Sequence, residues 1–495
     1  MSETRSENNQ RAIVVFKPSG KVVEVEIGTL VSDAAMEAGI ALSLPCGGQG
    51  RCGRCRVKVE HGPVSHRSAA RISSAERAEG WALGCQAVIK GDAIIVVPEQ
   101  AAVETEFVTK TVGAERIALA AEFSGEIDPS VRRFHLVIDP PSLEDQTTDW
   151  DRLVRALSLQ HGVQDVAAEL PMLRTLARDL REAEWRVTAV LDMGDPVVNP
   201  CYQPRLIDLL PGDQTDRCYG VAIDIGTTSN VIYLVDLRKG RVVDRASAYN
   251  AQIQAGEDVI SRIIFAQKRD GLARLQKLVL KTLNGLLDDL MARNQIPPGQ
   301  ISKAVVSGNT TMIQIFLSLD PKHIREMPFI PTIGQVPPVT AEQIGLNINP
   351  QATVDCLPVV GAYVGADITA GVLAAGIHET DALTLFIDVG TNGEIVLGNR
   401  DWLITCACSA GPAFEGSGVR HGMRATAGAI EEIWIDPASH EPTYETIGGL
   451  PVRGICGSGM IGLLADMFLT GVVDKGGKIR RDLPTPRVRV GDHGA

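Results

Sequence analysis

The sequence predicts a multidomain protein that combines α+β and α/β folds. Its 495 residues are enough for three or four domains. The first hundred residues alternate short β-rich runs with a cysteine-rich loop, which is typical of a small α+β domain. Two later segments repeat the order strand, Asp-x-Gly-Thr, strand, and this duplication predicts two lobes of one α/β domain.

Composition excludes several classes of protein. Hydrophobic residues make up 44% and charged residues 22%, as in ordinary globular proteins. The net charge of −12 and the 4% of aromatic residues disfavour nucleic-acid binding. No run of 18 apolar residues occurs, and the polar start has no apolar signal segment, so no membrane association is expected. We expect a cytoplasmic protein whose reduced thiols bind metal rather than form disulfides.

The first domain is expected over residues 10–98. Its elements follow in the order strand, strand, helix, strand and strand, over residues 12–17, 21–26, 29–38, 55–60 and 93–97. The turn Pro18-Ser19-Gly20 makes the first two strands a hairpin. Residues 99–125 are interpreted as a linker.

A middle α/β domain is expected over residues 126–212. Strand and helix patterns follow in the order strand, helix, helix and strand, over residues 133–139, 150–159, 170–183 and 185–191. The stretch 195–212 carries four prolines and is interpreted as a linker at the end of this domain.

The third domain is expected over residues 217–495, with a first lobe at about 217–380 and a second at about 381–495. A predicted meander, a helical region and a further strand cover residues 219–246, 258–294 and 303–307. In the second lobe, strands are predicted at 382–388 and 394–397, and a helix at 460–469. The two repeated aspartates, Asp224 and Asp388, are 164 positions apart.

Four cysteines form the first chemical signal. Cys46, Cys52 and Cys55 have the spacing C-x5-C-x2-C, and Cys85 follows 30 positions later. A close trio and a distant fourth thiolate can converge on one iron–sulfur cluster. Tetrahedral zinc is the alternative, but it usually takes two C-x2-C pairs and only one is present. The other six cysteines are expected to be small buried hydrophobes, with a redox role for Cys406 and Cys408 as the alternative.

The repeated Asp-x-Gly-Thr segments are the second signal. Backbone N–H groups and hydroxyls in a tight turn can hold phosphate oxygens, and an aspartate at the strand end can hold Mg²⁺. There is no G-x4-G-K-[ST] sequence, so the P-loop enzymes are excluded.

Residues 10–98 resemble a ferredoxin domain of the β-grasp fold with the adrenodoxin-like five-residue spacing, which implies a 2Fe–2S cluster held by the four cysteines. Such domains carry one electron at a time. Arg51, Arg54 and Arg56 flank the cysteines, either as solvated surface or as residues for partner docking or potential tuning.

Residues 217–495 resemble the superfamily of acetate and sugar kinases, heat-shock chaperone ATPases and actin. The resemblance implies an actin-like ATPase fold that binds ATP and Mg²⁺ through Asp224, Gly226, Thr227, Thr228, Asp388, Gly390, Thr391, Asn392 and Gly393. Asp367 either orients water or Mg²⁺ or simply begins a helix. The glycines of residues 454–459 either approach the nucleotide or pack a helix closely.

The combination of both domains resembles the RACo/RamA-like reductive activators of corrinoid proteins. The resemblance implies ATP-dependent, one-electron reduction of Co(II) to Co(I) in the corrinoid protein of a methyltransferase system, with electrons from an upstream donor. Ser409 would lie at the corrinoid contact. The alternatives are an electron-transfer protein whose degenerate ATPase domain only docks, and an activator of another low-potential metalloprotein.

The end of the chain departs from the superfamily pattern. A further strand, a glycine-rich adenosine loop and a closing helix normally follow the region at 454–470, whereas this sequence ends at Ala495. The second lobe is therefore expected to be incomplete, or to be completed by a partner or a homodimer mate.

Overall fold

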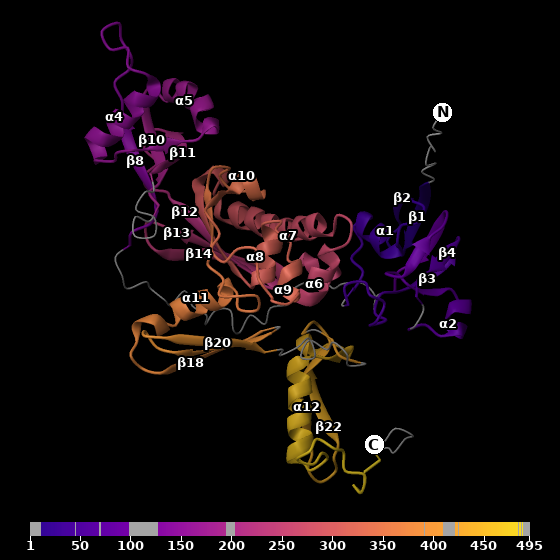
Figure 1. Ribbon diagram of the computed structural model, residues 1–495. Coiled ribbons are helices and arrows are strands. Elements are labelled where there is room, and N and C mark those ends of the chain that lie inside the picture. The colour runs from indigo at the N-terminus through magenta and orange to yellow at the C-terminus, as the bar shows by residue number, and fades with distance from the viewer. Residues whose placement is uncertain are drawn as a thin grey trace, which may run out of the picture. The chain divides into compact units, whose positions relative to one another are not determined.

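The computed structural model describes residues 11–44, 46–68, 71–98, 127–194, 203–390, 392–408, 421–423, 425–483, 485–486 and 488. The chain divides into two compact units. One contains residues 1–109, 252–265 and 376–495, and the other contains 110–251 and 266–375. Figure 1 labels the helices and strands along the chain. Among the described residues, no helix is long and apolar enough to cross a bilayer.

The N-terminal domain is built on a five-stranded mixed sheet in the order β2-β1-β7-β3-β5. Its strands are β1 (Arg11–Lys17), β2 (Lys21–Glu26), β3 (Arg56–His61), β5 (Trp81–Leu83) and β7 (Ala93–Val96). β1 and β2 form the predicted hairpin, while β1 and β7 run parallel. Three short elements complete the domain, namely β4 (Val64–His66), β6 (Ala87–Ile89) and α2 (Ser74–Ala78). The predicted α+β domain of the β-grasp type is confirmed.

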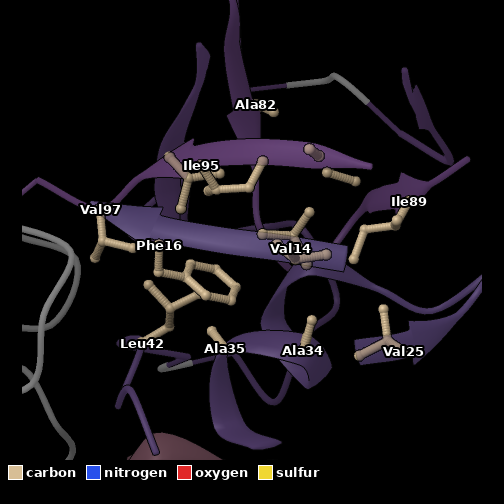
Figure 2. Packing of buried hydrophobic residues seen from close by; sticks show 14 of the residues in the cluster. Val14, Phe16, Val25, Ala34, Ala35, Leu42, Ala82, Ile89, Ile95 and Val97 are labelled. Atoms are coloured by element: carbon tan, nitrogen blue, oxygen red, sulfur yellow. The ribbon is translucent and has the colours of Figure 1, made fainter. Parts of the chain in front are cut away.

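The core of this domain lies between β1 and helix α1 (Val31–Glu37). Figure 2 shows Val14 and Phe16 of β1 pointing towards Ala34 and Ala35 of α1, and all four side chains are fully buried. Alternate residues of a strand face the same side, so Ala12, Val14 and Phe16 of β1 are buried on one face, whereas Ile13 on the other face is exposed. Burying a side chain such as Phe16 contributes about 1.5–3 kcal/mol.

The middle domain has a four-stranded sheet with two helices. Its strands are β8 (Val131–Val137), β9 (Ala167–Ala168), β10 (Arg186–Asp192) and β11 (Arg205–Pro211), in the order β8-β10-β11-β9. Helices α4 (Asp149–His161) and α5 (Leu170–Glu182) confirm the predicted helical patterns. In α5, Met172, Leu176 and Leu180 recur every four residues, which places them on one buried helix face.

The interpretation of residues 195–212 as a linker is wrong for its second half. Residues 205–211 form β11, which pairs along its length with β10. Leu206, Ile207 and Leu209 are buried there, and this burial outweighs the turn signal of the prolines. Pro204 and Pro211 lie just before the strand and at its last position, where the missing N–H disrupts little pairing.

The first lobe of the C-terminal domain is a six-stranded sheet in the order β14-β13-β12-β15-β17-β16. Its strands are β12 (Tyr219–Ile225), β13 (Ser229–Asp236), β14 (Arg241–Tyr249), β15 (Ile301–Gly308), β16 (Val339–Thr340) and β17 (Thr353–Cys356). β12, β13 and β14 form the predicted meander, and β15 lies parallel to β12. The long helix α7 (Gly271–Asn294) packs on β13 and β14.

A buried polar seam joins the middle domain to this sheet. Arg205 donates from Nη2 to the Thr353 hydroxyl at 2.7 Å, and that hydroxyl donates to Asp192. Lys303 of β15 lies 3.7 Å from the same Asp192 carboxylate. Beside them, Asn349 donates to Asp208 at 2.7 Å. Charges removed from water are costly unless partnered, so breaking one link leaves the others uncompensated.

The remaining segments of the C-terminal domain form two three-stranded sheets. One has the order β18-β19-β20, from β18 (Thr384–Val389), β19 (Gly393–Gly398) and β20 (Leu403–Cys408). The other has the order β22-β21-β23, from β21 (Ala429–Ile435), β22 (Pro442–Thr446) and β23 (Gly454–Ile455). Helix α12 (Gly457–Leu469) packs on β21.

The glycines of residues 454–459 pack these elements closely. A Cβ at Gly454 would lie 2.6 Å from the His421 carbonyl oxygen, and one at Gly459 would lie 2.3 Å from that of Ile430. Both distances are far below van der Waals contact. Of the two interpretations of this segment, the structure supports close packing.

Candidate functional site: two thiol pairs and a phosphate turn

The structure brings all four predicted cysteines together as two pairs. Cys46 and Cys52 have their sulfur atoms 3.4 Å apart, and those of Cys55 and Cys85 are 3.3 Å apart. Cys46 and Cys52 lie in the loop after α1, whereas Cys55 directly precedes β3 and Cys85 follows β5. Neighbouring strands of one sheet therefore bring the distant fourth cysteine back to the trio.

The cysteine loop is able to wrap closely because it is rich in glycine. Gly47, Gly48, Gly50 and Gly53 all have positive φ, between 60° and 82°. A Cβ at Gly50 would lie 2.8 Å from Cγ of Gln86. Gln86 donates from Nε2 to the Gly48 carbonyl at 2.7 Å and to the Cys85 sulfur at 3.7 Å. No local pattern indicates this amide, because its contacts form only when the loop closes over it.

Within each pair one sulfur donates a hydrogen bond to the other. Hydrogen bonding from Cys52 lowers the pKa of Cys46 to about 4, whereas the same bond and burial raise the pKa of Cys52. In the second pair, the bond between the two thiols raises the pKa of Cys55 and lowers the pKa of Cys85. Each pair thus shares a proton, which thiolate ligation of iron would release.

The donor set fits a 2Fe–2S cluster better than zinc. Such a cluster takes four thiolates, two on each iron, and the four sulfurs are already divided into two pairs. In the described part of the chain, no three His, Cys, Asp or Glu side chains are arranged around a single metal-ion position. A structural zinc ion would require four ligands around one point.

The first Asp-x-Gly-Thr segment forms the turn between β12 and β13. Asp224 is exposed at the end of β12, whereas Thr227 is buried in the turn. A Cβ at Gly226 would lie 2.3 Å from the Ser229 carbonyl oxygen, so the turn requires glycine at this position. Fully buried Asn250 donates to the Gly226 carbonyl at 2.8 Å, and its own N–H donates to the Thr228 carbonyl.

The start of helix α8 (Thr310–Phe316) contacts this turn, and the start of helix α11 (Ala366–Ala374) packs against that of α8. Asn309 is the N-cap of α8 and donates to the Thr227 hydroxyl oxygen at 2.9 Å. Gly365 is the N-cap of α11, and a Cβ there would lie 2.4 Å from Cα of Asn309. Asp367 is the second residue of α11 and is partly buried. Helix starts present unpaired N–H groups and favour anions, so the arrangement suits phosphate oxygens.

Asn309 and Asn250 hold this turn, and neither was predicted as a site residue. For Asn309 a signal was present, because asparagine before Thr310-Thr311 is a typical N-cap residue. For Asn250 there was none, since only the folded meander brings it to Gly226.

The second Asp-x-Gly-Thr segment also forms a turn between antiparallel strands. Asp388 in β18 pairs with Glu394 in β19, and the Gly390 N–H donates to the Asn392 carbonyl at 2.9 Å. Gly393 begins β19 and is buried. Asp224 and Asp388 belong to different units. Thr391 and Ser409 lie outside the described residues.

Cys406 and Cys408, on β20, are both exposed, so the expectation of buried hydrophobes is wrong for them. Their residues alternate with Ala407 along the strand, which places both on one face. Cys218, Cys356 and Cys456 are buried, as predicted. Cys201 lies outside the described residues.

Family models match most of the chain. They are the RACo linker region over residues 120–216, the RACo middle region over 219–380 and the C-terminal domain of RACo, the ASKHA domain, over 382–495. The corrinoid activation enzyme RamQ of Eubacterium limosum is 32% identical over 468 residues, which are 94% of this chain and 72% of the relative. The chain belongs to the RACo family of reductive activators of corrinoid proteins.

Other matches agree with membership of the RACo family. A solved structure titled as a reductive activator for corrinoid, iron–sulfur protein is 40% identical, with a TM-score of 0.63, over 98% of this chain and 76% of that one. The Co(II) methylated amine-specific corrinoid protein reductase of Methanosarcina barkeri is 25% identical over 52% of each chain. Residues 15–90 match the 2Fe-2S iron-sulfur cluster binding domain. Both predicted resemblances are confirmed. One is to a 2Fe–2S ferredoxin domain, and the other is to the superfamily of acetate and sugar kinases, heat-shock chaperone ATPases and actin, which is abbreviated ASKHA.

Proposed function

We propose that this protein reduces the cobalt of a corrinoid protein from Co(II) to Co(I), one electron at a time, and that ATP binding and hydrolysis drive the step. The two thiol pairs carry the proposal, since they supply four sulfur ligands for a one-electron carrier in a chain that also contains an ASKHA domain. We assign the domains to residues 10–98, 126–212 and 217–495.

We assign Cys46, Cys52, Cys55 and Cys85 as the cluster ligands. When bound, a 2Fe–2S cluster supplies one-electron transfer at low potential. Burial of Cys55 and Cys85 excludes water from one side of the ligand set, while exposed Cys52 leaves the other side within reach of a partner. The amide of Gln86 would stabilise negative charge on the Cys85 sulfur.

We assign the turn at Gly226, Thr227 and Thr228 to ATP phosphate binding, together with the second turn at Gly390, Thr391, Asn392 and Gly393. Asp224 and Asp388 would hold Mg²⁺ directly or through its waters. Asp367, at the start of α11, would orient a water molecule or the ion. We assign Ser409 to the contact with the corrinoid protein.

The energetic need for ATP follows from the potential of the cobalt couple. A gap of roughly 0.2–0.3 V between cellular donors and Co(I) costs roughly 5–7 kcal/mol for one electron. Closure of two lobes around a nucleotide is a general means of coupling such a cost to binding energy. The corrinoid substrate would come from a methyltransferase system, and the electrons from an upstream donor.

The test is an anaerobic assay of Co(I) formation in a Co(II) corrinoid protein by the cluster-loaded protein, with and without ATP. Visible absorbance follows the cobalt state, and phosphate release follows ATP hydrolysis. Cys85→Ala is expected to abolish Co(I) formation and to lower bound iron, whereas the control Cys406→Ala should change neither. Thr227→Val is expected to weaken ATP binding and to remove the ATP effect while iron content stays normal.

Equal Co(I) yields with and without ATP would overturn the ATP-coupled function and favour the electron-transfer alternative. An ATP-dependent reduction of a different metalloprotein, with none of the corrinoid, would favour the third alternative.

A further inference from the structure

The positive charge of the ferredoxin domain is concentrated around its cysteine loop. Residues 46–80 carry seven Arg or Lys and three Glu, whereas residues 11–45 carry three Arg or Lys and four Asp or Glu. The whole chain has a net charge of −12. The segment around the cluster ligands is therefore basic although the chain as a whole is acidic.

Three arginines form what we call the arginine rim, namely Arg51, Arg56 and Arg71. Arg71 donates from Nε to the Arg51 carbonyl at 2.7 Å, and Arg56 donates from Nη2 to the Arg71 carbonyl at 2.8 Å. These bonds tie the cysteine loop to the segment before α2 and order the side chains of Arg56 and Arg71. Arg56 also pairs with Glu76 at 2.7 Å.

Two of these charges have no acidic neighbour. Within the described part of the chain, no carboxylate lies within 4 Å of the guanidinium of Arg51 or Arg71. Both side chains are exposed. An ordinary solvated surface intersperses charges of both signs, whereas this one carries two positive side chains with no carboxylate partner.

Two residues of the rim, Arg56 and Arg71, border the exposed side of the ligand set. A cavity of about 580 Å³ is lined by Cys52, Gly53, Arg56, Arg71, Ile72 and Ser73. Cys52 is exposed, whereas Cys55 and Cys85 are buried. A protein that exchanges electrons with the bound cluster by the shortest route would thus contact this side.

We infer that the arginine rim is the docking surface for the protein that supplies electrons, and that this donor presents an acidic patch around its own redox centre. The inference rests on the proposed electron-carrier function. We place the corrinoid contact on the ATPase domain, which leaves this face to the donor. Complementary charge across a small interface mainly raises the association rate and fixes orientation.

The test uses the full-length, cluster-loaded protein and a purified acidic flavodoxin as the probe. The variant Arg51→Glu/Arg71→Glu is compared with Lys21→Glu/Arg11→Glu. Each pair makes the same change of −4 in net charge, but the control residues lie on β1 and β2. β7 separates β1 and β2 from β3 and β5, the strands next to Cys55 and Cys85.

Two readouts separate docking from turnover. Calorimetry with both proteins oxidised measures affinity without electron transfer. Stopped-flow absorbance follows the hydroquinone flavin giving one electron to the bound cluster, releasing a proton and becoming the semiquinone. At about 0.01 M salt, the rim variant should have about tenfold lower affinity for flavodoxin and an about tenfold lower rate of electron transfer than wild type. Both differences should shrink at about 1 M salt, because salt screens the charges. The control pair and the small reductant methyl viologen should show no such difference.

Equal affinities for the rim variant and the control pair would overturn the inference. An equally slowed reduction of the cluster by methyl viologen would also overturn it, because it would mean that the cluster is damaged. A third contrary result would be that the rim variant loses affinity for the corrinoid protein and not for flavodoxin. Saturation of the rim by inorganic phosphate alone, with unchanged flavodoxin binding, would likewise reassign it as an anion site. Intact docking with no ATP-dependent cobalt reduction would instead be a failure of the proposed function alone.

Discussion

Asn309 uses both ends of its side-chain amide, donating from Nδ2 to the Thr227 hydroxyl oxygen at 2.9 Å and accepting at Oδ1 from the Met312 N–H at 3.0 Å. One residue therefore caps helix α8 and holds the turn between β12 and β13, which we call the phosphate turn because we assign phosphate binding to it. The direction of the bond matters, because the Thr227 oxygen is the acceptor. A phosphate oxygen is also an acceptor, and the hydroxyl hydrogen can serve it only while Asn309 is the donor.

Substitution of Asn309 should separate these two roles. Asn309→Asp keeps the helix cap but can only accept, so the Thr227 hydroxyl would donate to the new carboxylate and a negative charge would face the phosphates. Asn309→Ala loses the cap, which costs about 1 kcal/mol. We expect Asn309→Asp to weaken ATP binding more than Asn309→Ala does, although it destabilises the fold less.

Calorimetric ATP titration and thermal unfolding of the two variants check this order. Equal ATP affinities for both variants would contradict the assigned direction of the hydrogen bond.

Gly226 should not tolerate any side chain. A Cβ would lie 2.3 Å from the Ser229 carbonyl oxygen, so Gly226→Ala must displace the backbone of the turn, at a cost of about 1–3 kcal/mol. ATP affinity should fall with it. The control is Gly285→Ala in helix α7, where nothing lies within 4 Å of the added Cβ. That change should stabilise the protein by up to about 1 kcal/mol and leave ATP binding unchanged. Denaturant unfolding measures both effects.

Gln86 should tune the potential of the bound cluster. Its amide donates to the Cys85 sulfur at 3.7 Å, and such a bond favours the reduced state, which carries more negative charge. A hydrogen bond of about 0.5–1.5 kcal/mol corresponds to roughly 20–65 mV for one electron. Gln86→Leu should lower the midpoint potential by this amount, and Gln86→Glu should lower it further. A potentiometric titration that gives the opposite order would refute the role.

Acid should loosen the segment that carries the arginine rim. The Ser73 backbone N–H and hydroxyl, together with Arg56, lower the pKa of Glu76 from 4.5 to about 2. Because the folded pKa lies below the ordinary one, the stabilisation is present above about pH 4.5 and disappears as the pH falls through about 2. The wild-type protein should therefore melt at a higher temperature than Glu76→Gln above about pH 4.5. This difference in melting temperature should disappear as the pH falls from about 4.5 to about 2.

Glu79→Gln is the matched control, since it makes the same change of charge at the end of the same helix. If the difference in melting temperature between wild type and Glu79→Gln changes with pH as steeply as it does for Glu76→Gln, Glu76 is not the cause of the acid effect.

Local patterns were enough to predict most of the fold. The β-rich runs on both sides of the turn Pro18-Ser19-Gly20 and the four-residue spacing in α5 are properties of the sequence itself. The hairpin and the helices α1, α4, α5 and α12 were therefore predicted to within three residues of their ends. The cysteine spacing was enough to predict that four thiols converge. Domain limits and the roles of the individual site residues stay predictions.

Other features depended on tertiary contacts that no local pattern encodes. β11 lies among prolines and became visible only through its pairing with β10. The contacts of Gln86 and Asn250 join segments that are 38 and 24 residues apart, and nothing in either sequence neighbourhood indicates the partner.

The seam centred on Thr353 fixes the middle domain to the six-stranded sheet. Arg205 and Asp192 share the Thr353 hydroxyl, and Lys303 of the neighbouring strand β15 reaches Asp192 as well. β15 ends at Gly308, next to Asn309, which holds the phosphate turn. The described residues 127–194 and 203–211 are thus fixed to the sheet through a strand that leads to Asn309, and we expect a tilt of β15 to move the middle domain with it.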